Sequence, residues 1–539
     1  MKKLYIGWDD IDWNLVRSKV FKWQQEVFSA SKIRSDKAVR KYQNKIVQSL
    51  YAKLLSVKRL TQENKHTSSM ALDEVMNILP HQRLALAKSL TISSKRSIVR
   101  NVCILKLKSR KKRLFHILFI KDRCLQLLFK LAIEPEWEAR FEENSYGFRP
   151  GRHSHDAISA IRFLIYNCPK YVLVVDQVNC FNLIDHEDLL EKTRLYGKFR
   201  KQLKFWLING VLASKIFSEN NPQPVIISSL LANISLHGVE KFCKRLIKSI
   251  PLYSSSGKML KRYYLTRSLG FVRYANSFVL IHSNLAVITL LQNKLPEFLR
   301  GIKIEFTSNM IYISHTLEIK ESIKYVCLGL AVKPGFNFLG FYIRQYRTFH
   351  MSVRGRKEQT LGFVSFLGPS KENRQAHQRK LHFLVLSVGK RVSQDVLIKK
   401  LNPVIWLWSK YFCRFATSHR YIITLLGKMD YILYLKLRQW ARRVYKTSGK
   451  GNVVFRTIGA NRWTFATEKV MLLKHIDCSK YATPYVKVMD ITSLYVRDQI
   501  YWANCISTDY SYIADLNMLL RKQNIICRCC NKQFNYKVC

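Results

Sequence analysis

Two short apolar runs constrain the fold of this chain most strongly, because each has the pattern of a strand that ends at polar side chains. YVLVVD at 171–176 is typical of a buried strand and ends in the carboxylate of Asp176. GFVRYANSFVL at 270–280 consists of β-forming residues interrupted by four residues that include Asn276 and Ser277. An aromatic, a small and two short polar residues between β-formers predict a hairpin whose tip faces a site. The side chains at the tip therefore decide what that site can do.

Helical patterns surround these strands. Residues 13–60 and 371–447 repeat apolar positions three and four apart, and 228–246 predicts one further helix. The Gly/Pro-containing stretch 141–158 predicts a loop that enters a helix, and 335–343 predicts a further strand. With 539 residues the chain is too long for one compact core, so two to four domains are expected. The coarse expectation is an α+β body followed by a helical, basic domain.

Charge is the strongest compositional signal. The chain has 91 Lys and Arg against 36 Asp and Glu, a formal net charge of +55. Such an excess strains a folded state by self-repulsion unless a polyanion neutralises it. The excess is also distributed, since residues 88–123 carry twelve Lys and Arg and residues 371–450 carry eighteen. Distributed basic faces predict an extended nucleic-acid surface, whereas the alternative of merely solvated lysines explains a modest excess better than this one.

Membrane insertion and disulfide bonding are not expected. No apolar run reaches the roughly 18–20 residues that span a bilayer. The opening MKKLYIGWDDIDW lacks the apolar core of a signal peptide, and its acids disfavour a transit peptide. Thirteen scattered cysteines, an odd number, fit a reducing compartment rather than a disulfide framework.

A series of motifs gives a more specific signal. They occur in this order along the chain: WDDIDW with VFKWQQEVFSASK, EPEWEARFEENSYGFRPGRHSHDAI, SSLLANISLHGVE, FNFLGF, PSKEN with LIKKLNPVIWLWSKYF and LRQWARRVY, and LLRKQNIICRCCNKQF. Together they resemble, in the right order, the reverse transcriptase/maturases encoded inside group II introns. In that family they correspond to the N-terminal RNA-binding extension, the fingers, the primer-grip-side helix, the later palm strand, domain X and the start of a zinc-type HNH nuclease.

The resemblance implies an α+β fold with right-hand polymerase-like fingers and palm. The implied parts are a helical N-terminal RNA-binding extension at 1–75, fingers and palm at 76–350, a helical thumb with domain X at 351–470, and a tail with a remnant HNH domain at 471–539. Asn402, Pro403, Trp408 and Tyr411 are expected to build the domain X core, and Trp23 the first helical pair.

The same resemblance makes the hairpin tip unusual. In this family the tip has the sequence Tyr-Ala-Asp-Asp, so Asn276 and Ser277 occupy the places of two carboxylates, and Asp176 matches the third. Polymerisation needs two Mg²⁺ ions that clamp the attacking and leaving oxygens, and Mg²⁺ is usually anchored by carboxylates. No Asp or Glu occurs between Lys241 and Pro296. DNA synthesis is therefore not expected, and Mg²⁺ would be needed only by an active polymerase.

Other departures from the family agree with this expectation. Proline at Pro224 replaces the glycine of a Pro-Gln-Gly turn, where it removes a backbone donor. Asn182 replaces a second aspartate after the first palm strand, and Met310 stands where a lysine is expected.

The C-terminal cysteines form at most part of a metal site. Cys527 and Cys530 have the CxxC spacing of half a zinc site, and a structural zinc needs four ligands. A nuclease would also need a metal-activating histidine beyond Cys539, so zinc binding stays open and strand cleavage is not expected.

Basic residues in three regions are predicted to contact RNA. In LRQWARRVY, Arg438, Arg442 and Arg443 share one helix flank, whereas Trp440 and Val444 share another that is expected to pack inside. A solvated face is the alternative for the arginines. The remaining predicted contacts are Lys53, Lys58 and Arg59 in the extension, Lys108, Arg110, Lys111, Lys112 and Arg113 in the fingers, and Arg149, which could instead form an ion pair. His153 and His155 are expected to be structural or to face RNA.

These features predict a splicing-type maturase that needs no cofactor of its own, since the intron RNA would hold the catalytic metals. Its expected partner is group II intron RNA, with a DNA target if the intron is mobile. Two alternatives stay open: a working reverse transcriptase, and a decaying reading frame, which the Trp406-Leu407 pair favours because the family usually has Arg-Gly there. Family habit and a Lys-, Ile-, Phe- and Tyr-rich composition favour an organelle, the chloroplast over the mitochondrion, with a bacterial origin and the oligomeric state left open.

Overall fold

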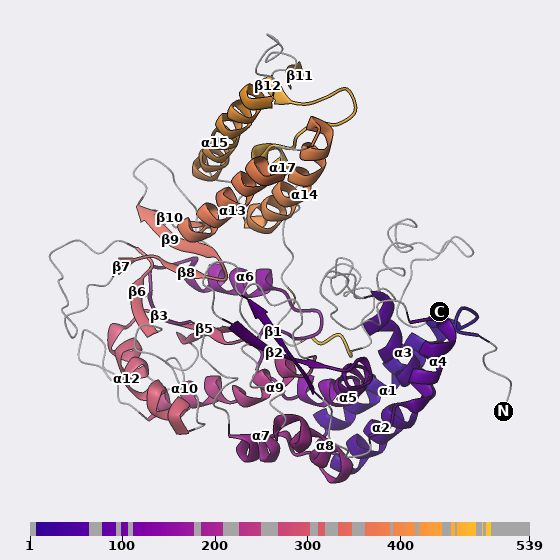
Figure 1. Cartoon of the computed structure of the whole chain (residues 1–539). Coiled ribbons are helices and arrows are strands. Elements are labelled where there is room, and N and C mark those ends of the chain that lie inside the picture. The colour runs from indigo at the N-terminus through magenta and orange to yellow at the C-terminus, as the bar shows by residue number, and fades with distance from the viewer. Residues whose placement is uncertain are drawn as a thin grey trace, which may run out of the picture.

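The computed structural model describes most of the chain. The described residues are 7–63, 78–92, 99–105, 112–176, 185–208, 226–249, 268–301, 311–317, 333–347, 362–388, 392–415, 420–444, 454–458, 461–480, 488 and 492–496. Helices and a central sheet combine in an α+β fold, as the sequence predicts (Figure 1). No helix in this part of the chain is long and apolar enough to cross a membrane.

The N-terminal extension is helical, as predicted. It consists of α1 (Trp13–Lys32), α2 (Asp36–Gln48), α3 (Leu50–Lys58), a π-helical turn η1 (Arg59–Glu63) and α4 (Pro80–Ser89). Asp12 begins α1 because its carboxylate accepts hydrogen bonds from the backbone N–H groups of Asn14 and Leu15. Trp23 packs edge-on against Tyr51, with ring centroids 6.2 Å apart, and so joins α1 to α3 as expected for the first helical pair.

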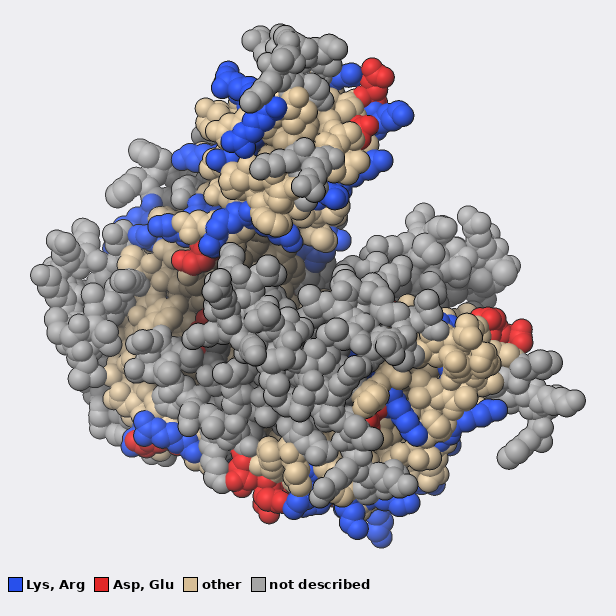
Figure 2. Space-filling model, viewed as in Figure 1, with Lys and Arg blue, Asp and Glu red and all other residues tan. Residues whose placement is uncertain are grey.

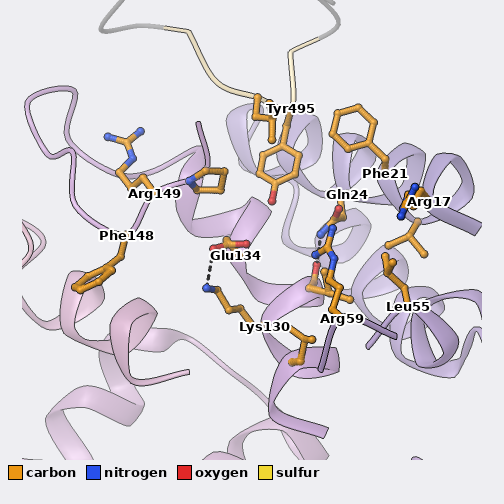
Figure 3. A pocket seen from close by; sticks show the side chains of 15 residues that line it. Arg17, Phe21, Gln24, Leu55, Arg59, Lys130, Glu134, Phe148, Arg149 and Tyr495 are labelled. Carbon is orange, nitrogen blue, oxygen red and sulfur yellow. Dashed lines mark hydrogen bonds and ion pairs between the residues drawn. The ribbon is translucent and has the colours of Figure 1, made fainter. Parts of the chain in front are cut away.

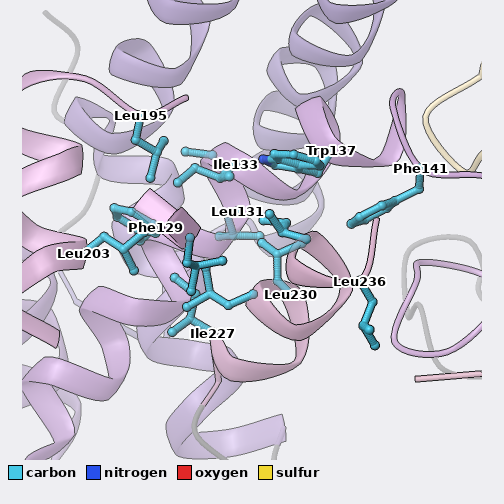
Figure 4. Close-up of a cluster of buried hydrophobic side chains, with 14 of the residues drawn as sticks. Phe129, Leu131, Ile133, Trp137, Phe141, Leu195, Leu203, Ile227, Leu230 and Leu236 are labelled. Carbon is cyan, nitrogen blue, oxygen red and sulfur yellow. The ribbon is translucent and has the colours of Figure 1, made fainter. Parts of the chain in front are cut away.

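Helix α5 (Ile120–Glu138) lies at the centre of the largest hydrophobic cluster, and the sequence analysis did not predict this helix. The hairpin strands β1 (Val99–Leu105) and β2 (Lys112–Leu118) precede this helix. Phe129 on α5 packs edge-on against Trp206, with ring centroids 5.0 Å apart. Figure 4 shows Phe129, Leu131, Ile133 and Trp137 facing Leu195, Leu203, Ile227 and Leu230 from other segments. The fingers and the N-terminal extension therefore share one hydrophobic core.

The central sheet has five strands in the order β4-β5-β3-β6-β7. Their bounds are β3 (Tyr171–Val175), β4 (Gly270–Tyr274), β5 (Ser277–His282), β6 (Ile311–His315) and β7 (Lys333–Pro334). Alternate residues face opposite sides, so Val172 and Val279 join the cluster under α6 (Ser154–Ile165), while Leu173 and Leu280 join the one under α12 (Leu285–Gly301). Both faces are covered, which explains why these strands are continuously apolar.

Helices α7 (His186–Thr193), α8 (Gly197–Ile208), α9 (Ser228–Ser235) and α10 (Val239–Lys248) complete the palm side. The prediction of one helix over 228–246 is wrong, because Gly238 has φ +102° and separates α9 from α10. The single strand expected at 335–343 is instead a hairpin of β8 (Phe336–Phe338) and β9 (Phe341–Arg347). Leu339 and Gly340 turn the chain there with φ +49° and +81°.

The predicted helical, basic domain is present. Its helices are α13 (Lys371–Phe383), continued by the π-helical turn η4 (Leu384–Val388), α14 (Gln394–Phe412), the 3₁₀ turn η6 (Cys413–Phe415) and α15 (Arg420–Val444). They follow strand β10 (Phe363–Pro369) and precede the ribbon β11 (Phe455–Ile458)–β12 (Asn461–Phe465) and helix α17 (His475–Lys480). Leu397, Leu433 and Cys478 belong to one buried cluster, so the packing of this domain continues past residue 470.

Two expectations about this domain need correction. Trp440 is buried as predicted, but Val444 is 45% exposed because the end of α15 extends beyond its packing partners. Tyr411 lies at the junction with the palm, since it packs against the cluster that contains Phe341. Trp408 contacts the same cluster but also packs on His377 and His475 within the helical domain. The Tyr411 hydroxyl donates to the backbone oxygen of Leu339 over 3.1 Å.

A late segment of the chain returns to its beginning. Tyr495 packs against Phe21 and Phe28 of α1, with ring centroids 6.1 Å and 5.8 Å away. The Arg152 guanidinium donates to the backbone oxygen of Thr492 over 2.8 Å. Residues from the tail therefore complete the surface of the N-terminal helices.

Candidate nucleic-acid interface

The tip of the β4–β5 hairpin lies beside the end of β3. Tyr274 pairs with Ser277 across the hairpin, and Val175 pairs with Phe278, so Asp176 falls next to Ser277. The Ser277 hydroxyl donates to Asp176 Oδ1 over 2.7 Å. The strand pairing thus brings Ser277, one of the two predicted tip positions, to Asp176.

These three side chains do not fit a pair of magnesium ions. Asp176 supplies the one carboxylate, and a neutral hydroxyl already occupies one of its oxygens. Asn276 carries no charge, and no group of three His, Cys, Asp or Glu side chains suited to a metal occurs among the described residues. Because hard divalent ions depend on several anionic oxygens, this set of donors cannot hold two of them. No step of a polymerase reaction follows from this geometry.

The fingers loop packs directly on the hairpin. The Tyr146 N–H donates to the Arg273 oxygen over 2.8 Å, and the Arg273 N–H donates to the Asn144 oxygen over 2.9 Å. A Cβ built on Gly147 would lie 2.2 Å from the backbone nitrogen of Ala275, so only glycine allows this approach. The loop and the hairpin therefore form one rigid unit.

Arg149 corrects one of the predicted RNA contacts. Its Nε and Nη2 donate to the two carboxylate oxygens of Glu138 over 2.9 Å and 2.8 Å. Nη1 donates to the backbone oxygens of Glu142 and Ser145 over 2.8 Å and 2.7 Å. Four of its five donor hydrogens are thus used in a buried site. Of the two roles expected for Arg149, the structure shows the ion pair, with Glu138 as its partner.

His155, near the same loop, has a structural contact. Burial lowers the pKa of His155 to about 4. Its Nε2 lies 2.8 Å from the backbone oxygen of Tyr411. The backbone N–H of His153 donates to Asp156 over 2.7 Å at the start of α6. His155 thus links α6 to α14.

A cleft of about 330 Å³ opens between the N-terminal helices, α5 and the fingers loop (Figure 3). Arg59, a predicted RNA contact, lines it together with Arg17 and Lys130. Lys130 pairs with Glu134 over 3.4 Å and Arg17 pairs with Glu63 over 3.1 Å. In Figure 3 Tyr495 points into the cleft from the returning tail. This cleft therefore presents a mixture of charges rather than a purely cationic surface.

The other predicted contacts of the extension are half-buried. Lys58 Nζ lies 4.0 Å from the centroid of the Trp13 ring, a cation–π contact. Burial lowers the pKa of Lys53, and burial with the nearby charge of Arg17 lowers that of Lys58. Both side chains keep part of their surface in solvent.

Several predicted sites fall outside the described residues. Lys108, Arg110 and Lys111 lie there, as do the cysteines of the zinc half-site, Cys527 and Cys530. Lys112 and Arg113 belong to strand β2, but their side chains are likewise outside what the structure describes.

Helix α15 presents the clearest cationic face. The predicted residues Arg438, Arg442 and Arg443 are all exposed on it. Tyr431 and Lys428 continue the same stripe toward the start of the helix, seven and ten residues before Arg438. Tyr431 is 58% exposed, and an exposed aromatic ring among cations is a platform on which bases stack. The sequence reading missed Lys428 and Tyr431, although their helical spacing could have revealed them.

The described surface of the whole helical domain is also predominantly cationic. Figure 2 shows Lys and Arg side chains predominating over Asp and Glu on the visible face of the upper helical domain. Within α13–α15 the acids are few: Glu372, Asp395 and Asp430. The last of these is buried against His475.

Comparisons with known families agree with this geometry. The family model of the N-terminal domain of reverse transcriptase matches residues 8–90, that of reverse transcriptase (RNA-dependent DNA polymerase) matches 104–343, and that of the group II intron maturase-specific domain matches 374–457. The fold and these matches define a reverse-transcriptase-like protein that carries a maturase-specific domain. The chain belongs to the group II intron-encoded reverse transcriptase/maturase family.

Individual relatives are more distant. Group II intron-encoded protein LtrA of Lactococcus lactis is 33% identical over 28% of this chain and 26% of its own length. Maturase-like protein 1 of Euglena gracilis is 26% identical over 73% of this chain and 74% of its own length. Protein YkfC of Escherichia coli is 25% identical over 44% of this chain, and the match spans 64% of YkfC.

The chain thus spans less than two thirds of some relatives, including YkfC and LtrA. Among solved structures, a telomerase from Candida albicans in complex with a fragment of telomeric RNA is 11% identical. The match covers 67% of this chain and 64% of the telomerase chain, with a TM-score of 0.29.

Proposed function

We propose that this protein binds its host group II intron RNA and assists splicing by holding the RNA in its active arrangement, without synthesising DNA. One observation supports this more than any other: among the three side chains Asp176, Asn276 and Ser277, the one carboxylate, Asp176, accepts a hydrogen bond from the hydroxyl of Ser277 over 2.7 Å. Splicing assistance needs no catalytic carboxylate and no cofactor in the protein. It needs cations that neutralise phosphates and surfaces that stack on unpaired bases.

The maturase-specific domain supports the same role. Its match covers α13, α14 and α15, which carry the exposed arginines. Relatives are named as a group II intron-encoded protein and as maturase-like proteins. The names of the Euglena relatives and of a protein in the cob intron of Schizosaccharomyces pombe suit an intron-borne protein. Residence in an organelle, the chloroplast rather than the mitochondrion, is part of this proposal.

The test is splicing of the host intron RNA at low Mg²⁺ with purified protein. We expect a higher splicing rate with the protein than without it, and tighter binding to the intron than to unrelated RNA of equal length. Asp176→Asn should leave the splicing rate within about two-fold of the natural protein, because the carboxylate has no part in this role. Equal rates with and without protein, together with no preference for the intron, would refute the proposal.

The second candidate is a working reverse transcriptase that moves the intron to a DNA target. The match to the polymerase model and the intact β4–β5 hairpin favour it. Primer extension on an RNA template with Mg²⁺ decides between the two, and appreciable cDNA would establish the second candidate.

A decaying reading frame should show damaged packing in the helical domain. Instead Trp406 and Leu407 are 37% and 66% exposed, so these departures from the family lie on the surface of α14. The opposite face of α14 keeps Leu397, Leu401 and Ile405 fully buried. This arrangement favours a chain under selection for folding.

A further inference from the structure

A cavity in the helical domain lies apart from the hairpin site. It has a volume of about 360 Å³ and lies between α13 and α15. Leu381, Met429 and Leu433 form an apolar floor, and each of them is buried. Cavities that bind small ligands are typically about 300–1,000 Å³, so this one has room for a single flat heterocycle.

The rim of the cavity is polar and cationic. Arg379 and Lys436 stand on it from opposite helices, and Gln375 and Gln378 add two side-chain amides from α13. None of the described residues that line the cavity is an Asp or Glu. A primary amide presents both donors and an acceptor, which is what the hydrogen-bonding edge of a base requires. The rim therefore suits an anionic ligand with a polar edge better than an apolar peptide.

The cavity continues into a narrower groove toward the end of α15. His382 and Lys436 line both, and Gln439 and Arg443 extend the groove. Cations at positions 436 and 443 thus follow one line along the helix. Such a line of cations is suited to contact the phosphates of a strand that leaves the cavity.

One polar atom of the cavity wall has no hydrogen-bond partner among the described residues. His382 Nδ1 is buried, and no described residue hydrogen-bonds to it. A buried polar atom of this kind usually meets water or a ligand, because leaving it unpaired is costly. His382 is shared by the cavity and the groove, so a bound nucleotide could reach it from either.

The back of the cavity is held rigid by a buried polar network. Asp430 accepts from the His475 ring at Nδ1 over 2.6 Å and from the Ile476 N–H over 3.1 Å. His475 Nε2 lies 2.9 Å from His377 Nε2, and the His377 ring stacks on Trp408 with centroids 4.6 Å apart. A preformed wall lowers the entropic cost of binding.

We propose that this cavity receives one unpaired nucleobase of the bound RNA, while Arg379, Lys436 and Arg443 hold the flanking phosphates. The inference rests on the proposed function, since it names the RNA feature that the helical domain recognises. An unpaired base buried against an apolar floor adds selectivity that phosphate contacts alone cannot give.

The test uses two RNA hairpins of equal length, one fully paired and one with a single unpaired 2-aminopurine bulge. The variant is Ile432→Trp, because Ile432 stands on the rim at 38% exposure and the larger ring fills the cavity. The matched control is Ile423→Trp on the same helix, 50% exposed and outside the cavity. Equal thermal unfolding midpoints for the three proteins establish that each is folded.

We expect the natural protein to prefer the bulged hairpin by about ten-fold, consistent with the stacking of one base. Its 2-aminopurine fluorescence should change on binding. Ile432→Trp should lose this preference and keep its affinity for the paired hairpin within about two-fold, and Ile423→Trp should behave as the natural protein. Equal binding of both hairpins by the natural protein, or an unchanged preference in Ile432→Trp, would overturn the inference. Neither result depends on splicing, so failure of the proposed function would be seen separately.

Discussion

The Ser277 hydroxyl satisfies Asp176 without a metal. A carboxylate at the end of a strand needs donors, and a neutral O–H at 2.7 Å supplies one at no cost in charge. The substitution thus leaves the hairpin and its register intact while removing the ligands that two metal ions require. Asp176 and Ser277 thus maintain the hairpin without providing a site for two metal ions. The fold can therefore be retained for a role other than polymerisation.

Gly147 is the position where a single methyl group should disturb the palm most. Gly147→Ala places Cβ 2.2 Å from the backbone of Ala275, and backbone cannot move aside as a flexible side chain can. We expect a loss of about 3 kcal/mol in the free energy of unfolding. Denaturant titration measures it.

Gly427→Ala is the matched control for that experiment. Gly427 lies within α15, and a Cβ built there meets nothing within 4 Å. Since alanine favours helix over glycine, we expect a gain of roughly 0.5–1 kcal/mol. If Gly147→Ala is as stable as the natural protein, the fingers loop does not approach the hairpin as closely as the structure shows.

At the scale of elements, local sequence patterns predicted most helices and strands. Contacts between residues far apart in the sequence could not be predicted from such patterns. The hairpin at 270–282 was predictable because its β-forming runs and polar tip are close together in the sequence. The break at Gly238 was missed because SSLLANISLHGVE keeps its apolar period across a residue with positive φ. The capping of α17 by Asp430 joins residues 45 apart in sequence, and no spacing rule covers that distance.

The cationic stripe of α15 should contribute additively to RNA binding. Replacing Arg438, Arg442 and Arg443 together by Gln should weaken intron binding, because three phosphate contacts and their released counterions are lost. The slope of log affinity against log salt should fall by roughly two. Filter binding at several KCl concentrations measures both effects.

The matched control removes the same charge elsewhere. Lys198, Lys201 and Lys204 are exposed on α8, which lies at the opposite end of the molecule in Figure 1. Their replacement by Gln should change the slope by less than half as much. A similar loss for both variants would mean that net charge, rather than the α15 stripe, determines binding.

The buried histidines of the helical domain should make its stability depend on pH. Burial and the neighbouring His475 lower the pKa of His377 to about 3, against about 6.5 in an unfolded chain. Between these values the unfolded state binds more protons than the folded one, so stability is lost as the pH falls below about 6.5. From pH 7.5 to pH 5 this residue alone should cost about 2 kcal/mol.

His377→Gln isolates that contribution. Glutamine can still bond to His475 but does not titrate, so the variant should lose less stability than the natural protein over the same pH interval. His155 and His237, whose pKa values burial lowers to about 4 and about 3, act equally in both proteins and cancel in the difference. Identical pH dependence of the two proteins in denaturant titrations would exclude this role for His377.

For the whole molecule, the net charge of +55 should give salt opposite effects on folding and on binding. Added KCl screens self-repulsion, so the thermal midpoint of the free protein should rise between about 20 and 200 mM. Over the same interval the affinity for RNA should fall, because each counterion released from the RNA gains less entropy in a more concentrated salt solution. Differential scanning fluorimetry and binding titrations in the same buffers measure the two effects. A thermal midpoint that falls as salt is added would contradict the prediction.

The return of Tyr495 to Phe21 and Phe28 has a consequence for biosynthesis. Helix α1 leaves the ribosome well before the ring that covers part of its apolar face, because Tyr495 follows Phe28 by 467 residues in the chain. At about 5–20 residues per second, that face waits for tens of seconds. During translation the nascent helices are therefore exposed to chaperones, and to any nearby transcript, before their own tail can cover them.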